Sequence, residues 1–336
     1  MKEKGKKVIV AISGGVDSSV AAALLKRAGF DVEAVFLRLF DSPSFLKNEK
    51  IAKKIAKHLD VGFSVLDKRR EFKKKIIDMF LREYERGQTP NPCVICNKEI
   101  KFDGLFDKGD LVATGHYAKK VKSESFYKIL KAKDKNKDQS YFLWKLKQKD
   151  LKRIIFPLGD YLKSEVFKIA SNLKIPIPNV SESQEVCFIG KDVEKFLSLR
   201  LKKRPGYILN KEGKVVGQHQ GLHFYTIGQR KRIKLSGGPF YVLKKNIKDN
   251  SLVVTKDKKD LESKAFFIRN INWISGKNNS KSFSAKVKIR YQSPSFSCKV
   301  IGKKVVLSNP QRAVTPGQSA VFYKGQELLG GGIIEL

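Results

Sequence analysis

The stretch VIVAISGGVDSSVAAALL, residues 8–25, decides the fold of the first half of this 336-residue chain. It opens with an apolar run of buried-strand length, continues through Ser13, Gly14 and Gly15, and then shows an alanine- and leucine-rich helix pattern that ends at Gly29. Such a turn presents free backbone N–H groups at the positive end of a helix dipole, which favours phosphate binding. The stretch has neither GxxxxGK[ST] nor GxGxxG, and a tight turn with a serine cap is the alternative interpretation.

Strand and helix patterns alternate outward from this stretch. We predict further strands at 32–39, 61–66 and 111–114. Apolar residues at helical spacing lie between them, and these are Ile51, Ala52, Ile55, Ala56 and Leu59, followed by Phe72, Ile76, Phe80 and Tyr84. Repeated strand–helix units predict an α/β fold with a parallel sheet covered on both faces.

The pattern changes after residue 205, where short strands are separated by glycines. From about residue 264 apolar residues alternate with period two. One predicted face contains Phe283, Ala285, Val287, Ile289 and Tyr291, and the alternation continues with Phe296, Cys298 and Val300. This alternation is typical of antiparallel sheet and predicts a small barrel. We therefore predict three domains, with boundaries at 1–200, 201–263 and 264–336.

The charge balance indicates a polyanionic partner. The chain has 69 Lys+Arg against 33 Asp+Glu, a formal net charge of +36. A lysine-biased composition with solvated surface charge is the alternative. No apolar run approaches the roughly 20 residues that span a bilayer, and the first apolar run is too short for a signal peptide, so we predict a cytoplasmic protein without a membrane partner.

The cysteines are few and two of them lie close together, in TPNPCVICNKEIKF (89–102). Four cysteines in a large cytosolic chain do not form a disulfide scaffold. Cys93 and Cys96 could be half of a zinc site, a redox pair, part of an iron–sulfur site or a reaction centre. Cys298 lies on an apolar strand face, and we predict that it is a small core residue.

The full string SGGVDSS resembles the PP-loop of the ATP pyrophosphatase family, whose members cleave ATP to AMP and pyrophosphate. Other stretches extend the resemblance in order along nearly the entire chain, and these are TPNPCVICNKEIKF, ATGHYAKK (113–120), KDQSYFLWKL (137–146), FPLGDYLKSEV (156–166), SQEVCFIG (183–190), GQHQGLHFYTIGQRK (217–231) and PGQSAVFY (316–323). Together they resemble the tRNA-specific 2-thiouridylases. The resemblance implies an adenine nucleotide alpha hydrolase-like PP-loop domain, a small central tRNA-contacting domain and a C-terminal β-domain.

Such enzymes replace the C2 oxygen of the wobble uridine with sulfur in tRNAs for lysine, glutamate and glutamine. Adenylation by ATP turns the oxygen into a leaving group, a cysteine persulfide supplies sulfur, and a second thiol closes a disulfide behind it. By resemblance, Cys187 carries the persulfide and Cys96 is the nucleophile that attacks it or helps to liberate sulfide. A cysteine desulfurase or a relay protein would donate the sulfur, and we expect a monomer.

The resemblance also assigns binding residues. Asp17 is expected to associate with Mg²⁺ and pyrophosphate. The remaining ATP-binding residues are expected to be Ala11, Ile12, Ser13, Gly14, Gly15, Val16, Ser18, Leu37 and Gly115. Contacts with the target base or the tRNA are expected from Asn91, Pro92, Cys93, His116, Lys137, Asp138, Gln139, Arg290, Tyr291 and Gln318.

One position departs from a common form of the family. Cys93 stands where many members have an aspartate that is proposed as an acid/base, so that role is in doubt here. A [4Fe-4S] cluster held by Cys93, Cys96 and Cys187 is an alternative to persulfide chemistry, because thiolates suit such clusters. A structural zinc site is a third interpretation and lacks a fourth ligand.

Both thiols must ionise to react, and a neighbouring Lys98, Lys101 or His116 could lower their pKa values. Two other functions compete with tRNA thiolation. One is a PP-loop synthetase that adenylates a small molecule, which has no need for two cysteines or for a charge of +36. The other is a non-catalytic RNA-binding protein, which an intact PP-loop and both cysteines disfavour.

Overall fold

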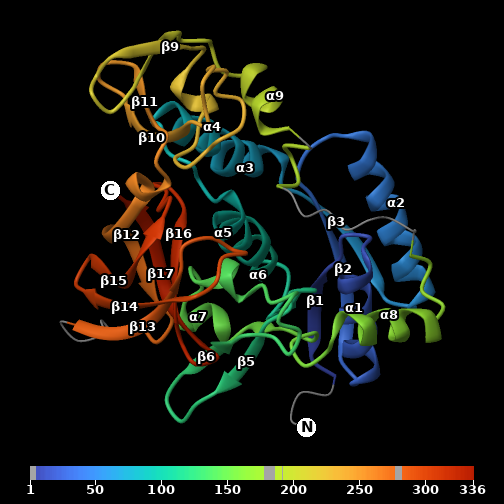
Figure 1. Ribbon diagram of the computed structural model, residues 1–336. Helices are drawn as coiled ribbons and strands as arrows, with labels where there is room; N and C mark the ends of the chain where they lie inside the picture. Colours follow the sequence, from blue (N-terminus) through green and yellow to red (C-terminus); the bar gives the residue numbers. More distant parts are fainter. Residues whose placement is uncertain (1–4, 178–185, 191, 277–281) are drawn as a thin grey trace.

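A five-stranded parallel sheet forms the first layer of the protein, at the right of Figure 1. The computed structural model describes residues 5–177, 186–190, 192–276 and 282–336. The sheet has the order β3-β2-β1-β4-β7, and every neighbouring pair is parallel. Its strands are β1 (Lys7–Ala11), β2 (Asp31–Arg38), β3 (Gly62–Asp67), β4 (Leu111–Ala113) and β7 (Ile154–Ile155).

Both faces of this sheet are covered, as the alternation of strands and helices predicts. Val8 and Val10 of β1 pack in one cluster while Ile9, between them, packs in another. The helices α1 (Val16–Arg27), α2 (Pro43–His58) and α8 (Lys163–Asn172) share apolar clusters on one side. The continuous apolar run at the start of the chain is therefore a central strand buried on both faces.

The other face carries two broken helices in which α-helical and π-helical turns alternate. The first is made of α3 (Arg69–Phe72), η1 (Lys73–Ile77) and α4 (Asp78–Glu85). The second is made of α5 (Pro92–Ile95), η2 (Cys96–Phe102) and α6 (Asp103–Phe106). The predicted apolar stripe of the first helix, Phe72, Ile76, Phe80 and Tyr84, is buried throughout. π-Helical turns are uncommon and frequently lie at functional sites.

The central domain lies above α4 in Figure 1. Its four strands have the order β10-β11-β8-β9 and surround a small apolar core. Its elements are α9 (Val193–Ser198), β8 (Gly206–Leu209), β9 (Val215–His219), η4 (Leu222–Phe224), β10 (Tyr241–Asn246), β11 (Ser251–Thr255) and η5 (Lys258–Leu261).

The C-terminal strands form a closed antiparallel barrel of the order β12-β15-β14-β13-β16-β17, because β12 also pairs with β17. The strands are β12 (Glu262–Trp273), β13 (Ser282–Lys288), β14 (Phe296–Ile301), β15 (Lys304–Arg312), β16 (Ser319–Lys324) and β17 (Glu327–Glu335). Cys298 is 4% exposed within its apolar core, which confirms the predicted core role.

The barrel continues into the first domain, which the sequence did not predict. The hairpin of β5 (Lys119–Lys122) and β6 (Tyr127–Leu130) pairs with β17 and extends the barrel sheet. The short elements η3 (Ser140–Leu143) and α7 (Gln148–Leu151) follow it, and Trp144 packs against Gly331 of β17. The first domain and the barrel are therefore joined by backbone hydrogen bonds through this hairpin, as well as by side chains.

Two predicted strand residues, Ile289 and Tyr291, lie beyond the strand. β13 ends at Lys288, and Tyr291 lies in the following turn, where Ser293 donates backbone and side-chain hydrogen bonds to the Arg290 carbonyl oxygen. The ring of Tyr291 packs on Phe142, with 4.5 Å between centroids. The period-two pattern extended past the strand because the turn residue is also apolar. No helix in the described residues is long and apolar enough to cross a membrane.

Candidate functional site

The turn between β1 and α1 is built to receive phosphate. Gly15 is the N-cap of α1 and no side chain caps the helix there, which leaves its first N–H groups for a ligand. The serines instead bond within the turn: Ser18 Oγ accepts from Ser13 N at 3.0 Å, and Ser19 Oγ donates to the Gly15 carbonyl oxygen at 2.8 Å. The serine-capped helix, the alternative interpretation of the stretch, is therefore absent.

Two glycines make this turn possible. Gly14 has a φ of +81°, and a Cβ there would lie 2.7 Å from the Asn48 carbonyl oxygen. Gly115 follows β4, and a Cβ there would lie 2.7 Å from Ser18 N and 2.8 Å from the Asp17 carbonyl carbon. Both positions tolerate only glycine because the obstructing atoms are backbone. The predicted nucleotide residues from Ala11 to Ser18 and Gly115 are thus brought together at the carboxyl edge of the sheet, where ligands bind in open α/β folds. Leu37 lies in β2, the strand beside β1.

The carboxylate of Asp17 is held by two residues that the sequence did not identify. Lys163 Nζ lies 2.6 and 2.8 Å from its two oxygens, and Tyr117 Oη donates to Oδ1 at 2.7 Å. Both side chains are buried. Gln139 supports Tyr117 from the other side, because Gln139 Oε1 accepts from Tyr117 N at 3.0 Å. Lys163 lies 146 residues from Asp17 in the chain, and no local pattern connects them.

The cysteine pair lies on the helix that faces the barrel. Cys93 is on α5 and Cys96 begins η2, so the π-helical turns start at the predicted nucleophile. Cys96 is 7% exposed. Burial raises the pKa of Cys96 to about 12, with smaller contributions from Cys187 and Cys93, and burial also raises the pKa of Cys93. Phe102 at the end of η2 packs on His116, with 6.0 Å between ring centroids, which joins this helix to the nucleotide edge.

Cys187 is brought to the same site by its neighbour in sequence. The ring of Phe188 contacts Phe72 and Phe80 edge-on, with 5.6 and 5.4 Å between centroids, and also Phe196 of α9. Cys187 itself is exposed, yet desolvation of its thiol raises its pKa to about 11, followed by the influence of Cys93. The three thiols thus interact electrostatically, whereas Cys298 lies in the barrel. Residues 183–185 of SQEVCFIG lie outside the described residues.

The structure separates the three cations that were candidates for lowering the thiol pKa values. Lys98 pairs with Asp103 and with Asp150, the latter at 3.2 Å. His116 is buried beside Thr114 Oγ1 at 2.7 Å, and desolvation lowers its pKa well below 6.5, so it is neutral and supplies no charge. Lys101 acts on all three thiols in the direction that favours the thiolate. Of the three candidates, only Lys101 fits the role of lowering the thiol pKa values. The prediction that His116 could do so is wrong, because a neutral imidazole carries no positive charge.

Two of the residues predicted to contact RNA, Asp138 and Arg290, are already hydrogen-bonded within the protein. Asp138 is buried, and its carboxylate accepts from Ala132 N at 3.1 Å and from Ser140 Oγ at 2.9 Å. Arg290 donates to the Ala313 carbonyl oxygen at 2.7 Å and to Thr315 Oγ1 at 3.0 Å. These bonds order loops at the site, and contact of either residue with RNA stays a prediction.

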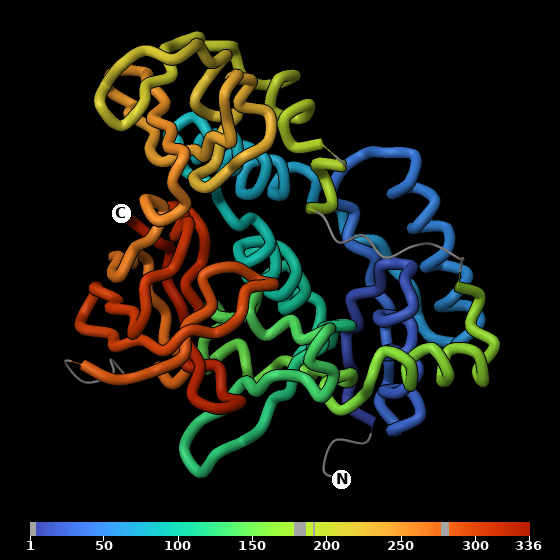
Figure 2. The backbone as a smooth tube through the Cα atoms, in the orientation of Figure 1, coloured from blue at the N-terminus to red at the C-terminus, as the bar shows by residue number. Residues whose placement is uncertain are grey.

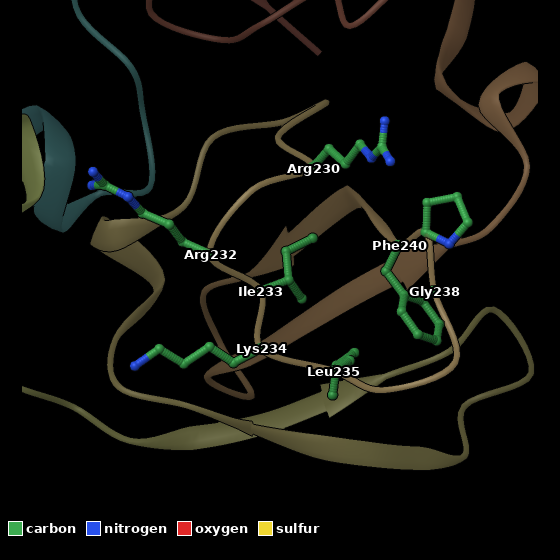
Figure 3. Close-up of a pocket in the computed structure, with 8 residues that line it drawn as sticks. Arg230, Arg232, Ile233, Lys234, Leu235, Gly238 and Phe240 are labelled. Carbon is green, nitrogen blue, oxygen red and sulfur yellow. The ribbon is translucent and has the colours of Figure 1, made fainter.

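The central domain contains a basic cavity of about 340 Å³, away from the cysteines. Figure 3 shows Arg230, Arg232 and Lys234 extending from it in different directions, so they do not converge on one anion. Arg232 is already paired with Asp192 and Glu194 at 3.2 and 2.9 Å. The cavity is therefore a basic surface feature without the geometry of a single anion site.

The donor groups present decide which metals the site could hold. Within the described ranges no group of three or more His, Cys, Asp or Glu side chains is arranged to hold a metal ion. Cys93, Cys96 and Cys187 are therefore not arranged as a metal site in the described residues, and an iron–sulfur cluster stays the alternative to the persulfide route. The Asp17 carboxylate, in contrast, has the oxygen donors that Mg²⁺ prefers.

An uncapped helix start after a glycine turn, with a half-buried aspartate at the carboxyl edge of a parallel sheet, defines a PP-loop nucleotide enzyme. Three family models match the chain in order: the tRNA methyl transferase HUP domain at residues 6–191, the tRNA methyl transferase PRC-barrel domain at 194–256 and the aminomethyltransferase beta-barrel domain at 263–334.

Full-length relatives identify the family more closely. The chain is 40% identical to tRNA-specific 2-thiouridylase MnmA of Carboxydothermus hydrogenoformans, over 98% of both chains. It is 40% identical to the protein of the same name from Buchnera aphidicola subsp. Schizaphis graminum, over 100% of this chain and 98% of that one, and 39% identical to that from Clostridioides difficile, over 98% of both. The chain belongs to the family of tRNA-specific 2-thiouridylases.

Proposed function

We propose that this chain is a tRNA-uridine 2-sulfurtransferase that thiolates the wobble uridine, position 34, of tRNAs for lysine, glutamate and glutamine at the expense of ATP. The observation that carries the proposal is the joint presence, in one domain, of a phosphate-binding turn and of Cys96 in the apolar cluster against which Phe188, the neighbour of Cys187, packs. The names of the relatives support it. A synthetase acting on a small molecule would need the phosphate-binding turn but not the two cysteines.

The proposed reaction starts with adenylation. The C2 oxygen of the uracil attacks the α-phosphorus of ATP, and pyrophosphate leaves. The N–H groups at the start of α1 would hold the phosphates, since they are uncapped and lie at the positive end of the helix dipole. Tyr117 and Lys163 fix the orientation of Asp17 beside them. The C2 carbon then carries a leaving group, AMP, in place of an unreactive oxygen.

Sulfur transfer follows at the thiols. The terminal sulfur of a Cys187 persulfide attacks C2, and AMP departs with the former C2 oxygen. The Cys96 thiolate then attacks Cys187 Sγ, so that the sulfur bound to C2 is released as the 2-thiocarbonyl and a Cys96–Cys187 disulfide forms. In the alternative order, Cys96 attacks the persulfide first and hydrogen sulfide adds to C2. In both orders of reaction, the thiols of Cys96 and Cys187 together lose two electrons as their disulfide forms. An external dithiol must then reduce this disulfide.

Lys101 supplies the charge that this chemistry needs. In the free protein burial keeps both reacting thiols protonated, because it raises the pKa of each. Lys101 is the cation that opposes this effect at both thiols. Cys93 takes the place of an acid/base aspartate, and burial raises its pKa too, so it would act in the thiol form as a proton donor.

RNA binding would use the segment that carries the cysteines and the barrel beside it. Asn91, Pro92 and Cys93 start α5, and Tyr291 reaches from the barrel onto Phe142 of the first domain. The excess positive charge fits a tRNA, whose phosphates release counterions on binding. The remaining proposed contacts with the target base or the tRNA are His116, Lys137, Asp138, Gln139, Arg290 and Gln318.

The accompanying factors are proposed on the same basis. ATP would be bound with Mg²⁺ near Asp17, and the metal would neutralise charge on the leaving pyrophosphate. The sulfur donor would be a cysteine desulfurase or a relay protein. We further propose domain boundaries at 1–200, 201–263 and 264–336, a monomer and a cytoplasmic location.

The test is formation of 2-thiouridine on unmodified glutamate tRNA, measured by nucleoside mass spectrometry. The enzyme is verified metal-free before addition of ATP, Mg²⁺, a dithiol and a cysteine desulfurase with cysteine. Matched reactions contain α,β-methylene ATP, which cannot release pyrophosphate, or a tRNA with cytidine at position 34. Both controls should contain no 2-thiouridine.

The outcomes separate the competing functions. Thiolation by metal-free enzyme supports the persulfide route. Product that appears only after anaerobic iron–sulfur reconstitution would contradict that route. Pyrophosphate release that depends on a small molecule and ignores tRNA would show a synthetase instead.

A further inference from the structure

Residues 87–91, which we call the strap, lead from α4 into the helix that carries both Cys93 and Cys96. Figure 2 shows the chain passing from α4 down to α5 between the central domain and the barrel. Its last residue, Asn91, is the N-cap of α5. The position of the strap therefore sets where the cysteine helix begins.

The barrel holds the strap through its backbone. Thr89 N donates to the Pro316 carbonyl oxygen at 2.9 Å, and Gln318 Nε2 donates to the Thr89 carbonyl oxygen at 2.8 Å. Both polar backbone groups of one strap residue are thus satisfied by the turn before β16. The same turn also holds Tyr141 of the first domain, because Tyr141 Oη donates to the Ser319 carbonyl oxygen at 2.9 Å.

The fit between the turn and the strap is close. Gly317 has a φ of +90°, and a Cβ there would lie 2.9 Å from Thr89 N, 3.0 Å from the Thr89 carbonyl carbon and 3.0 Å from Gln88 Cβ. Backbone atoms cannot turn aside as the end of a long side chain can. Any side chain at position 317 must therefore displace the strap.

The central domain contacts the other side of the strap less favourably. Gly87 packs against Ile247 and Lys245, and Thr89 Oγ1 lies 3.4 Å from Thr226 Oγ1. Two buried polar atoms of the central domain, His223 Nε2 and Lys245 Nζ, have no hydrogen-bond partner in the described residues, and the same holds for Oε1 of Gln88 in the strap itself. A buried polar atom without a hydrogen-bond partner destabilises the folded protein. The barrel rather than the central domain therefore fixes the strap.

We propose that Gln318 and Gly317 are positioning residues, which hold the strap so that Cys96 meets Cys187 and the start of α5 faces the target base. The inference rests on the proposed function for its second part, and it gives Gln318 a role in addition to the tRNA contact proposed above. The barrel is then part of the catalytic scaffold, and distortion of its turn at residues 316–319 reaches the cysteines through Thr89.

The experiment compares Gln318→Met, which keeps the length of the side chain but cannot donate, with Gly317→Ala. Gly302→Ala is the matched control, since Gly302 also has a positive φ (+57°) in a barrel turn, but a Cβ there would meet no atom within 4 Å. Each folded variant is assayed for the kcat of thiolation, for the Kd of tRNA at several salt concentrations, and for the rate of Cys96–Cys187 disulfide formation with diamide in the free enzyme.

For Gln318→Met we expect kcat to fall about tenfold and disulfide formation in the free enzyme to slow about fivefold. Gly317→Ala should show larger losses of the same kind, and Gly302→Ala should behave as wild type. A weaker tRNA Kd with unchanged kcat and disulfide rate would overturn the inference, and so would wild-type behaviour in Gln318→Met. The disulfide rate needs no tRNA, so it reports on positioning even if the protein proves not to thiolate tRNA.

Discussion

The nucleotide end and the cysteine end of this site are built in different ways. At the nucleotide end, eight consecutive residues from Ala11 to Ser18 form the turn, and the charge of Asp17 is matched by Lys163 at 2.6 Å. At the cysteine end, the thiols come from segments about 90 residues apart and are held by aromatic packing and by the strap. The first end is ready to bind its ligand, whereas the thiols are protonated until something lowers their pKa values.

The difference teaches that the two half-reactions are separable. In the proposed reaction, adenylation would depend on a local turn with preformed electrostatics, and sulfur transfer would depend on tertiary positions that the barrel helps to set. Changes at one end should therefore leave the chemistry of the other measurable.

The largest expected effect follows from Cys187→Ser. We expect thiolation to be abolished because a serine cannot carry a persulfide, while ATP and tRNA binding are retained. Nucleoside mass spectrometry measures thiolation, and tRNA-dependent ATP–pyrophosphate exchange shows whether ATP and tRNA are still bound. A variant that thiolates at the wild-type rate would show that sulfur does not pass through this residue.

Gly115→Ala tests the nucleotide end alone. The new Cβ would lie 2.7 Å from Ser18 N, so the phosphate-binding turn must shift. We expect ATP affinity to fall on the order of 100-fold, measured by calorimetry, with transfer of ³⁵S from the desulfurase to Cys187 unchanged. Gly62→Ala in the same sheet is the control, since its nearest neighbour would be a flexible side-chain atom at 3.7 Å. Loss of ³⁵S transfer in Gly115→Ala alone would contradict the separation of the two ends.

The pH dependence of alkylation sharpens the description of the cysteine end. Because its pKa is raised to about 11, Cys187 is almost entirely protonated at neutral pH, and its thiolate fraction grows about tenfold for each pH unit. The iodoacetamide rate, followed by peptide mass spectrometry, should still rise between pH 9 and 10. An ordinary thiol levels off above about 8.5, as Cys187 should in the urea-unfolded chain. A plateau near pH 8.5 in the folded protein would mean that Lys101 already compensates burial.

Lys163→Met tests the ion pair at the nucleotide end. The change leaves the Asp17 carboxylate without its cation, so it would repel the phosphates of ATP. We expect the KM for ATP to rise about fivefold with a smaller change in kcat, measured by pyrophosphate release. Lys133→Met is a matched control, because Lys133 pairs with Glu165 of the same helix at an exposed position. An unchanged KM would limit Lys163 to a structural role.

The smallest effect is expected for Cys298→Ser. Its thiol donates to the Ala285 carbonyl oxygen in the barrel core, at 3.4 Å, and a serine hydroxyl can do the same. Thiolation should stay within about twofold of wild type, with a melting temperature lowered by a few degrees because a more polar group is buried. A large loss of activity in the folded variant would place this cysteine in the chemistry.

The order of domains and most of the first sheet were predictable because each strand is a short apolar run between helical stripes. Phe72, Ile76, Phe80 and Tyr84 occupy the predicted buried face, and the barrel core contains Val287 and Cys298 as the period-two pattern indicates. Tyr291 was misplaced because periodicity does not show where a strand ends. The β5–β6 hairpin was missed since its pairing partner lies about 200 residues away.

The sequence by itself determined the phosphate turn, because neighbouring residues and glycine's freedom at positive φ are sufficient to form it. It also indicated the residues of sulfur chemistry, through a resemblance that extends along the chain. Only the tertiary structure decided which groups surround them: Lys163 and Tyr117 on Asp17, Lys101 rather than His116 beside the thiols, and Gln318 on the strap. Charge pairing and burial depend on distance in space, and in these cases that distance is unrelated to separation along the chain.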